Sequence, residues 1–298
     1  MSTATRKLPR SEQLSRQRRS AWARRALRPA LIYAVLLFGM LFTLMPSLWM
    51  LSSAFKISEE ITTYPPTLVP HTATLDNFSV VLTKVQFPRF FLNSFIICAL
   101  TITGHLVSGS LAAFGFARLR FPGRNALFML LLSTLIIPFY AYMIPRFVII
   151  RALGLYDTLI AVVLPYMFGG PFYIFLMRQY FMSLPMELDD AARIDGCSSF
   201  GIYWRILLPL ARPALATVAV LEFIAAWKSF LEPLIYLSNP SNYTVALGLT
   251  LFRSGFGGQV QWGPLMAATT LSALPPLIVC FAMQKHLVGG IAGTGLKG

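Results

Sequence analysis

Long apolar stretches separated by short polar segments dominate the pattern along this chain. The first of them, residues 29–53, has no charge and exceeds the roughly 20 residues that a helix needs to cross a bilayer. Its apolar core is too long for a cleaved signal peptide, although small residues follow it, so we expect an uncleaved span. The whole pattern predicts an all-α polytopic membrane protein with six transmembrane helices. We place the spans at residues 29–53, 90–117, 125–145, 158–178, 213–237 and 263–284.

The polar segments complete the organisation of the chain. Residues 1–28 form a basic tail, residues 183–212 form a long loop between the fourth and fifth spans, and residues 285–298 form a C-terminal tail. Residues 54–89 precede the second span, and within them Asp76 opens a short amphipathic helix. Six spans place both termini and the long loop on the same side of the membrane.

Composition and charge support a membrane protein and predict its orientation. Hydrophobic residues make up 56% of the chain and charged residues 12%, far from the mix of a soluble domain. The net charge of +14 raises the alternative of a nucleic-acid-binding protein. However, 18 of the 25 basic residues lie on the side of the termini and the long loop, nine of them within residues 1–28. Because basic residues favour the cytoplasmic side, we expect cytoplasmic termini and no nucleic-acid partner.

Prolines and glycines interrupt the third and fourth spans. Pro138 and Pro145 predict kinks or ends in the third span, followed by a compact outside connection that includes Arg146 and Arg151. In the fourth span, residues 164–171 read LPYMFGGP and imply a broken helix. Broken helices are tolerated at membrane depth where they line a cavity or are covered by protein, so we expect this span to face a pathway through the protein.

Ionisable residues inside the spans are candidates for function. Glu222, Lys228 and Glu232 lie in the fifth span, where a charge costs on the order of 2.5–3.5 kcal/mol and therefore faces protein or water. Lys228 and Glu232 are four residues apart and can pair on one helix face, either as a structural ion pair or as part of a cavity wall. His105 is either a gating residue or a neutral imidazole bonded to a neighbouring helix. The small residues that suit close packing of the second span are Gly104, Ser108, Gly109, Ala112 and Ala113.

The loop at residues 183–212 concentrates negative charge and begins with a predicted short helix. Its acidic residues, four of the 11 in the chain, are Glu187, Asp189, Asp190 and Asp195. Ser183 and Pro185 suit the start of this helix, and acidic side chains favour its positive N-terminal end. Gly196 supplies the left-handed residue that ends it.

A second short helix with an apolar face follows the bend. Ser198 or Ser199 can cap it, and apolar residues keep helical spacing until Pro209 ends the run. The two helices form an amphipathic elbow that is small enough to fit a cleft on a partner protein. The name elbow denotes residues 183–212 below.

The amino-acid sequences of the elbow and of the C-terminus resemble those of a known family. Four features at fixed spacing resemble the EAA loop of the membrane subunits of bacterial ABC importers, in the maltose-type carbohydrate-uptake branch. The matching residues are Asp190, Ala191, Ala192, Gly196, Ile206, Leu208 and Pro209. The family usually has Glu at the first of these positions, so the shorter Asp190 has to approach a partner's basic group more closely. The final HLVGGIAGTGLKG resembles the FVxGLTAGAVKG ending of one of the two permease subunit types.

The resemblance implies the ABC type I importer permease fold and a defined set of partners. These are a second permease subunit in a heterodimer, two ATPase subunits, an extracytoplasmic sugar-binding protein and the lipid of the bacterial cytoplasmic (inner) membrane. ATP and Mg are expected on the ATPase and no cofactor on this chain. The residues implied in ATPase coupling are Asp190, Ala191, Ala192, Asp195, Gly196, Ile206, Leu208 and Pro209. The tail residues implied in contacting the ATPases are Gly290, Lys297 and Gly298.

The implied function is that of a permease subunit that forms half of the membrane pathway for a sugar, such as a di- or oligosaccharide. The candidate pathway residues are Tyr166, Phe172, Tyr173, Glu222, Trp227 and Lys228. The aromatic residues among them can stack on a sugar, although aromatic residues of membrane helices more often serve packing. At the Lys228 position related permeases usually have Asn, which leaves open whether this charge is structural or lines the pathway.

Two other classes of function, an enzyme and a secondary transporter, have weaker support in the sequence. The chain has no phosphate-cradling G-x-x-x-x-G-K-[ST] pattern, no H-E-x-x-H helix and no nucleophile elbow, so we assign no catalytic residue and no metal ligand. A secondary transporter using Glu222, Lys228 and Glu232 would be expected to show internal repeats, which the chain lacks. Within the importer interpretation, a glycerol phosphodiester or a polyol remains an alternative substrate.

Overall fold

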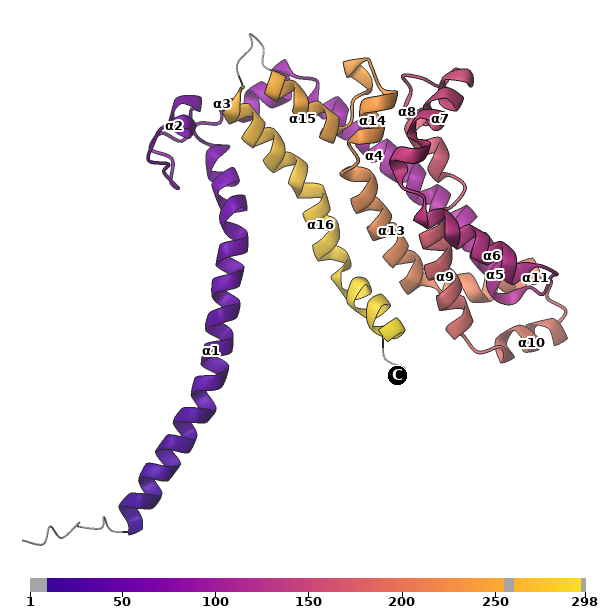
Figure 1. The fold of residues 1–298 in the computed structure, drawn as a ribbon, viewed down its shortest axis with the longest axis horizontal. Coiled ribbons are helices and arrows are strands. Elements are labelled where there is room, and N and C mark those ends of the chain that lie inside the picture. The colour runs from indigo at the N-terminus through magenta and orange to yellow at the C-terminus, as the bar shows by residue number, and fades with distance from the viewer. Residues whose placement is uncertain (1–9, 255–259, 296–298) are drawn as a thin grey trace, which may run out of the picture.

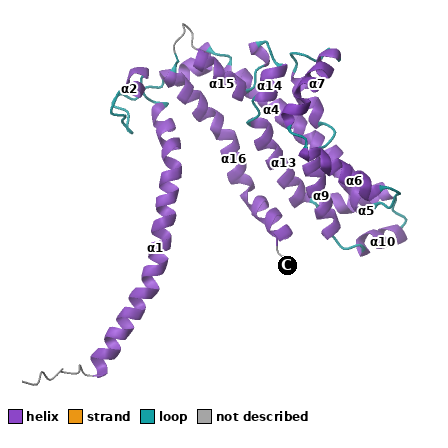
Figure 2. Ribbon diagram, in the orientation of Figure 1, coloured by secondary structure: helices purple, strands orange, loops and turns teal. Residues whose placement is uncertain are grey.

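The computed structural model describes residues 10–254 and 260–295, with side chains described at position 29 and within residues 31–253 and 260–284. These ranges fold into helices joined by short loops (Figure 2). In the described part of the chain, four helical segments are long and apolar enough to span a membrane, and two bent helix pairs raise this to six. This agrees with the predicted all-α architecture of six spans.

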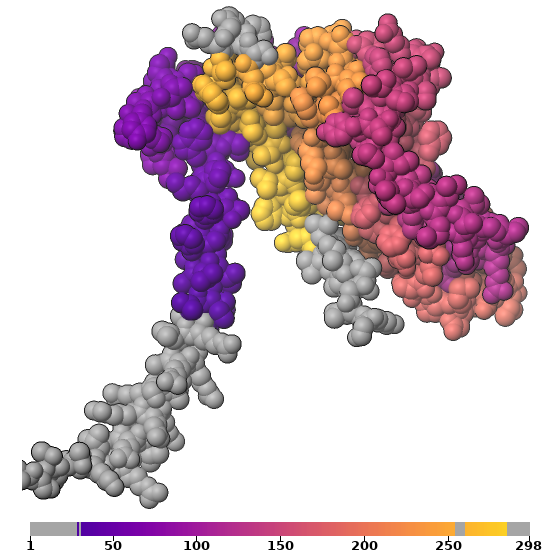
Figure 3. Space-filling model, viewed as in Figure 1, coloured from indigo at the N-terminus to yellow at the C-terminus, as the bar shows by residue number. Residues whose placement is uncertain are grey.

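The first span stands apart from the rest of the molecule. Helix α1 (Arg10–Ser53) continues the span backwards through the described part of the basic tail. None of its most apolar window, within Leu31–Ser53, is buried (Figures 1 and 3). A helix that is apolar on all sides is suited to lipid or to another apolar helix. Helix α2 (Ser58–Thr62) follows it in the loop before the second span.

The second span is a long helix with a local change of winding. The predicted short helix at Asp76 is present as α3 (Asp76–Ser79) and η1 (Val80–Lys84). The span itself consists of α4 (Phe87–Gly104), the π-helical segment η2 (His105–Gly109) and α5 (Ser110–Arg118). Its small residues allow the close packing of α5 against α9 of the fourth span.

The third span is strongly bent and extends further along the chain than the sequence indicates. Helix α6 (Arg124–Ser133) and the 3-10 turn η3 (Thr134–Ile136) meet α7 (Phe139–Ala152) at an angle of 99°. The bend falls at Pro138, as expected. Pro145 lies inside α7, so the expectation that Arg146 and Arg151 belong to a loop is wrong.

The fourth span is broken where the sequence predicts. Helix α8 (Leu159–Val163) and the 3-10 turn η4 (Leu164–Tyr166) are separated from α9 (Pro171–Ser183) by residues 167–170. The left-handed Gly169, with a φ of 79°, lies against Gly109 of the second span, where a Cβ would come within 3.0 Å of the Gly109 Cα. The break therefore packs on small residues of its neighbour.

The remaining helices complete the elbow and the last two spans. The elbow contains α10 (Glu187–Ile194), α11 (Ser199–Ile202), η5 (Tyr203–Leu207) and α12 (Leu208–Leu210). The fifth span contains α13 (Arg212–Trp227) and α14 (Leu231–Tyr236). The 3-10 turn η6 (Pro240–Asn242), α15 (Val245–Ser254) and α16 (Trp262–Gly295) follow.

The loops sort to the two ends of the helix bundle. The start of α1, the end of α16 and the elbow lie at one end, and α2, α7, α14 and α15 lie at the other (Figure 1). The predicted position of both termini relative to the membrane stays a prediction. Three apolar clusters hold the helices together, one of them at the elbow end.

Candidate functional site

The first helix of the elbow has the predicted end but a different start. Gly196 has a φ of 81° directly after the last turn of α10, as predicted for the residue that ends this helix. The prediction that Ser183 caps it is wrong, because α9 runs through Ser183 and its hydroxyl donates to the Tyr180 carbonyl at 2.7 Å. Helix α10 begins only at Glu187, after Pro185.

The second helix of the elbow has the predicted cap but ends later than predicted. The Ser198 hydroxyl accepts a hydrogen bond from the Gly201 N–H at 3.1 Å, which satisfies one free donor at the start of α11. The helical run passes Pro209, ends at Leu210 and meets α13 at an angle of 75°. The elbow thus changes direction at Ala211, beyond the predicted end at Pro209.

The residues implied in coupling divide into an outward and an inward set. The exposed members are Asp190, Ala191, Asp195, Gly196 and Pro209. Ala192 is only 5% exposed and packs inward, and Ile206 and Leu208 are partly buried against the same core. Neighbouring apolar side chains also point outward, including Ile194 and the stacked pair Phe200 and Trp204.

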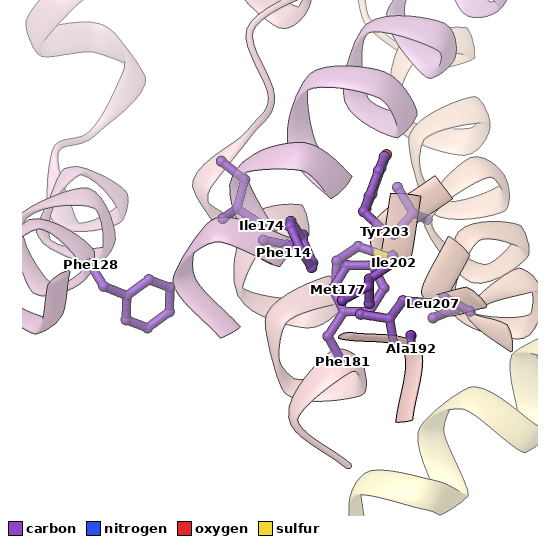
Figure 4. Close-up of a cluster of buried hydrophobic side chains, with 13 residues drawn as sticks. Phe114, Phe128, Ile174, Met177, Phe181, Ala192, Ile202, Tyr203 and Leu207 are labelled. Atoms are coloured by element: carbon purple, nitrogen blue, oxygen red, sulfur yellow. The ribbon is translucent and has the colours of Figure 1, made fainter. Parts of the chain in front are cut away.

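A continuous apolar core joins the elbow to the spans (Figure 4). Elbow residues Ile202, Tyr203 and Leu207 pack with Phe114 of α5 and Phe181 of α9. Each of these five side chains is at most 7% exposed. The elbow is therefore a packed extension of the helix bundle.

A buried arginine, which the sequence indicates only as part of a charge bias, fastens the elbow at its base. The Arg118 guanidinium donates to the carbonyl oxygens of Phe181 at 2.7 Å and Leu184 at 2.9 Å. One of its nitrogens also lies 3.7 Å from the Asp189 carboxylate. Burial raises the pKa of Asp189 above its usual value, and the nearby Arg118 opposes that rise. Its position at the end of an apolar run is the sequence signal that could have identified Arg118 as a contact residue.

A second set of polar residues surrounds the buried Glu232 within the spans. Arg146 of α7 forms an ion pair with Glu232 of α14, with an N–O distance of 3.0 Å. The Tyr166 hydroxyl donates to the same carboxylate at 2.5 Å, and the Arg146 guanidinium lies over the Tyr166 ring. The predicted Lys228–Glu232 pair is therefore wrong. Helix α13 ends at Trp227 and α14 begins at Leu231, so Lys228 is exposed and off the helix face of Glu232.

Glu222 lies beside the same region, close to His105. The His105 Nδ1 is 2.9 Å from the Thr101 carbonyl oxygen and 3.9 Å from the Glu222 carboxylate. The Tyr173 ring packs edge-on against the imidazole, with ring centroids 4.7 Å apart. The bonded-imidazole alternative for His105 agrees with the short contact to Thr101, although that carbonyl belongs to the same helix and not to a neighbour.

Glu222 and Glu232 line a common cavity of about 70 Å³. Its other polar walls are Thr101, Tyr166 and Ser229. A volume of this size holds one or two water molecules and no sugar ring. The cavity is thus a small polar space between the second, fourth and fifth spans.

The other candidate pathway residues lie in different surroundings. Phe172 is 48% exposed, at the start of α9. Trp227 is 4% exposed, packs on Phe95 and donates its indole N–H to the Ser272 carbonyl at 3.0 Å. Trp227 therefore belongs to an apolar cluster and not to the polar cavity.

The C-terminal tail is described only in part. Gly290 lies in the last turns of α16, whereas Lys297 and Gly298 lie outside the described residues. Within the described residues, no three His, Cys, Asp or Glu side chains gather into a group able to hold a metal ion.

Comparisons with known proteins show the family of this chain from its sequence and a similar fold from its structure. The family described as binding-protein-dependent transport system inner membrane component matches residues 105–293. The probable ABC transporter permease protein YurM of Bacillus subtilis is 38% identical over 254 residues, which cover 85% of this chain and 83% of YurM. The arabinooligosaccharides transport system permease protein AraQ of Halalkalibacterium halodurans is 35% identical over 256 residues, covering 85% of this chain and 91% of AraQ.

A solved structure has a similar fold. A chain of a bacterial ABC transporter involved in the import of the acidic polysaccharide alginate superposes with a TM-score of 0.77 at 24% sequence identity. The match covers 94% of this chain and 99% of the other.

Proposed function

Because this chain belongs to the family of binding-protein-dependent transport system inner membrane components, we propose that it forms half of the membrane pathway of an ATP-driven sugar importer. The chain is an ABC transporter permease subunit rather than an enzyme, and it has the fold of such permeases. The elbow carries the proposal for its mechanism. It exposes Asp190 on a unit whose inward face is packed into the bundle.

Coupling to ATP hydrolysis is assigned to the elbow. Asp190 contacts a basic residue of a separate ATPase subunit, which binds ATP and Mg. Gly196 makes the bend, and Ile206 and Leu208 anchor the second helix on the apolar core. When two ATPase subunits close, the elbows of two permeases move with them and turn the cavity from one side of the membrane to the other. The tail residues Lys297 and Gly298 reach between the ATPases.

The assembly and its location follow from the same family. The chain pairs with a second permease subunit and with two ATPase subunits in the bacterial cytoplasmic membrane, crossing it several times. An extracytoplasmic binding protein delivers the substrate. The excess of basic residues at the elbow end supports a cytoplasmic elbow and cytoplasmic termini.

The proposed substrate is a sugar, in the class of di- and oligosaccharides. A relative that is 35% identical is named for the transport of arabinooligosaccharides. The proposed pathway side includes Tyr166 and Glu222 of the small cavity and Tyr173, which packs on His105. The cavity has to widen to admit a sugar ring, in keeping with a pathway that is closed in this conformation.

Co-purification with a reversed elbow charge tests this function. The tagged chain is expected to retain an ATPase, a second permease and a sugar-binding protein, and Asp190→Lys is expected to lose the ATPase alone. Asp190→Glu, which has the family's usual residue, is expected to retain it. Glu59→Lys reverses an exposed acid at the other end of the bundle and serves as the matched control. Recovery of the ATPase with Asp190→Lys, together with unchanged ATP-dependent transport, would contradict the proposal.

A further inference from the structure

Helix α5 is fastened to the elbow side of the molecule at both of its ends. At its C-terminal end, Arg118 is 4% exposed and donates to the carbonyls of Phe181 and Leu184. These carbonyls belong to the last turn of α9 and the residue after it, where the Phe181 carbonyl accepts one further bond, from the Leu184 N–H at 3.3 Å. A cation at a helix C-terminus is also favoured by the helix dipole. Arg118 therefore joins two spans through backbone groups.

The same guanidinium reaches the start of the elbow's first helix. It lies 3.7 Å from the Asp189 carboxylate in the first turn of α10, and it contacts the Met186 sulfur. One side chain thus touches the end of α9, the short connection and the beginning of α10. Because Arg118 presents a planar fork with several donors, a lysine cannot reproduce this set of contacts.

At its other end, α5 is joined to the second helix of the elbow. The hydroxyl groups of Ser110 and Tyr203 are buried and lie 2.7 Å apart. Between the two ends, Ala113 and Phe114 pack against the elbow core, and the rings of Phe114 and Tyr203 have centroids 5.3 Å apart. Polar contacts at both ends and an apolar contact between them restrain rotation as well as translation.

The π-helical segment η2 immediately precedes α5 in the chain and runs towards the polar cavity. His105 at its start is beside Glu222, and Gly109 at its end is beside Gly169 in the break of the fourth span. Single π-helical turns are local irregularities in a helix that occur often at functional sites. A displacement of α5 is therefore passed to residues next to Glu222.

We propose that Arg118 is a positioning residue that makes α5 and the elbow move as one body, and that this movement reaches the polar cavity through η2. The proposal rests on the proposed coupling role of the elbow and adds the route by which its motion enters the membrane. Arg118 itself touches neither the ATPase nor the substrate.

Transport per ATP hydrolysed, measured in proteoliposomes with the complete importer, tests the role of Arg118. Arg118→Gln is expected to assemble with the ATPase and hydrolyse ATP, but to lower this ratio by about tenfold or more, because small misplacements of a positioned group have large effects on rate. Arg118→Lys is expected to have a transport-to-ATP ratio between those of Arg118→Gln and the original chain. Arg120→Gln, which removes an exposed arginine two residues away, is the matched control and is expected to leave the ratio unchanged. An unchanged ratio in Arg118→Gln would overturn the proposal.

A cross-link provides a test that does not depend on the stability of Arg118 variants. Ser110→Cys and Tyr203→Cys are combined in a chain without its three native cysteines and bridged by a bifunctional methanethiosulfonate reagent. If α5 and the elbow move as one body, transport continues after bridging, as in the two single-cysteine controls. Loss of transport with continued ATP hydrolysis would mean that they move relative to each other, and the proposal would be wrong.

The outcomes separate this inference from the proposed function. If Asp190→Lys keeps its ATPase and its transport, the coupling role of the elbow fails, and the inference fails with it. If Asp190→Lys loses the ATPase while Arg118→Gln transports with the normal ratio, only the route through α5 fails.

Discussion

The two ends of the bundle each hold an arginine beside a buried carboxylate, but the arginines are satisfied in different ways. At the elbow end, Arg118 donates mainly to backbone carbonyls, and its carboxylate partner is 3.7 Å away. At the opposite end, Arg146 lies 3.0 Å from Glu232, and the Tyr166 hydroxyl bonds the same carboxylate. The contacts of Arg118 chiefly hold helices together. The contact of Arg146 chiefly compensates the charge of Glu232.

This difference predicts which partner is indispensable at each end. A carboxylate left without its counter-charge in a buried site is strongly unfavourable, because few other groups solvate it there. Two carbonyl oxygens, in contrast, continue to bind Arg118 when the nearby carboxylate is neutral. We therefore expect the Arg146–Glu232 end to depend on charge balance and the elbow end to depend on the guanidinium alone.

Removing Arg146 is expected to have the largest effect. Arg146→Met leaves Glu232 buried without its counter-charge and is expected to destabilise the protein by about 3–5 kcal/mol. The measurement is the thermal unfolding midpoint of the purified complex in detergent. The double variant Arg146→Met with Glu232→Leu removes both charges and is expected to recover much of the loss. A double variant as unstable as Arg146→Met would show that charge balance is not what holds this end.

A glycine between the two ends is expected to have the next largest effect. Gly104 faces the break of the fourth span, where an added Cβ would lie 2.6 Å from the Met167 Cα. Gly104→Ala therefore forces two backbones apart and is expected to cost about 1–3 kcal/mol. Gly115→Ala adds the same methyl group to α5 where nothing lies within 4 Å, and it is expected to be neutral or slightly stabilising. Equal midpoints for the two variants would contradict the close approach.

Local signals made much of the elbow predictable. The left-handed Gly196 and the cap at Ser198 depend on contacts within a few residues, and both are present. The break of the fourth span was predicted for the same reason, since Gly169 and its neighbours disfavour a helix wherever they occur. Ser183 was assigned wrongly because α9 continues through it, beyond the end at residue 178 that was expected for the fourth span.

Contacts between distant parts of the chain were beyond the reach of sequence patterns. Spacing suggested Lys228 as the partner of Glu232, whereas the actual partner, Arg146, is 86 residues away in the chain. That choice depends on the 99° bend of the third span, which carries Arg146 to α14, and on the end of α13 at Trp227. A periodic pattern reports which residues share a helix face, but it does not report which helices meet.

At the end opposite the elbow, a loop carboxylate provides a weaker test of charge dependence. Backbone N–H groups of Asn239 and Ser238 each donate to Asp157 at 2.9 Å and lower its pKa. A lowered pKa contributes stability above the unfolded value of about 4, and this stability is lost as the pH falls through the folded pKa. Asp157→Asn is expected to lose only about 1 kcal/mol at neutral pH, because solvent screens this partly exposed group.

The positive φ of Asp157 supplies the control for this variant. Its φ of 60° lies in the left-handed region, which asparagine tolerates and alanine does not. Asp157→Ala is therefore expected to lose more than Asp157→Asn. Hydrogen exchange at the amides of Ser238 and Asn239 measures both effects locally. Unchanged exchange in both variants would show that this carboxylate does not order the loop.

The smallest effect on stability is expected at Asp189. The direction of its change with pH tests the comparison between the two ends of the bundle most directly. Burial raises the pKa of this carboxyl, so its contribution to stability is complete below the unfolded pKa of about 4 and is lost as the pH rises through the folded pKa. Asp189→Asn cannot ionise and is expected to remove this pH dependence while remaining within about 1 kcal/mol of the original chain at pH 7. The measurement is the difference in unfolding midpoint between the two proteins from pH 4 to pH 7. If Asp189→Asn were instead destabilised as strongly as Arg146→Met, Arg118 would depend on its counter-charge after all, and both ends of the bundle would be held in the same way.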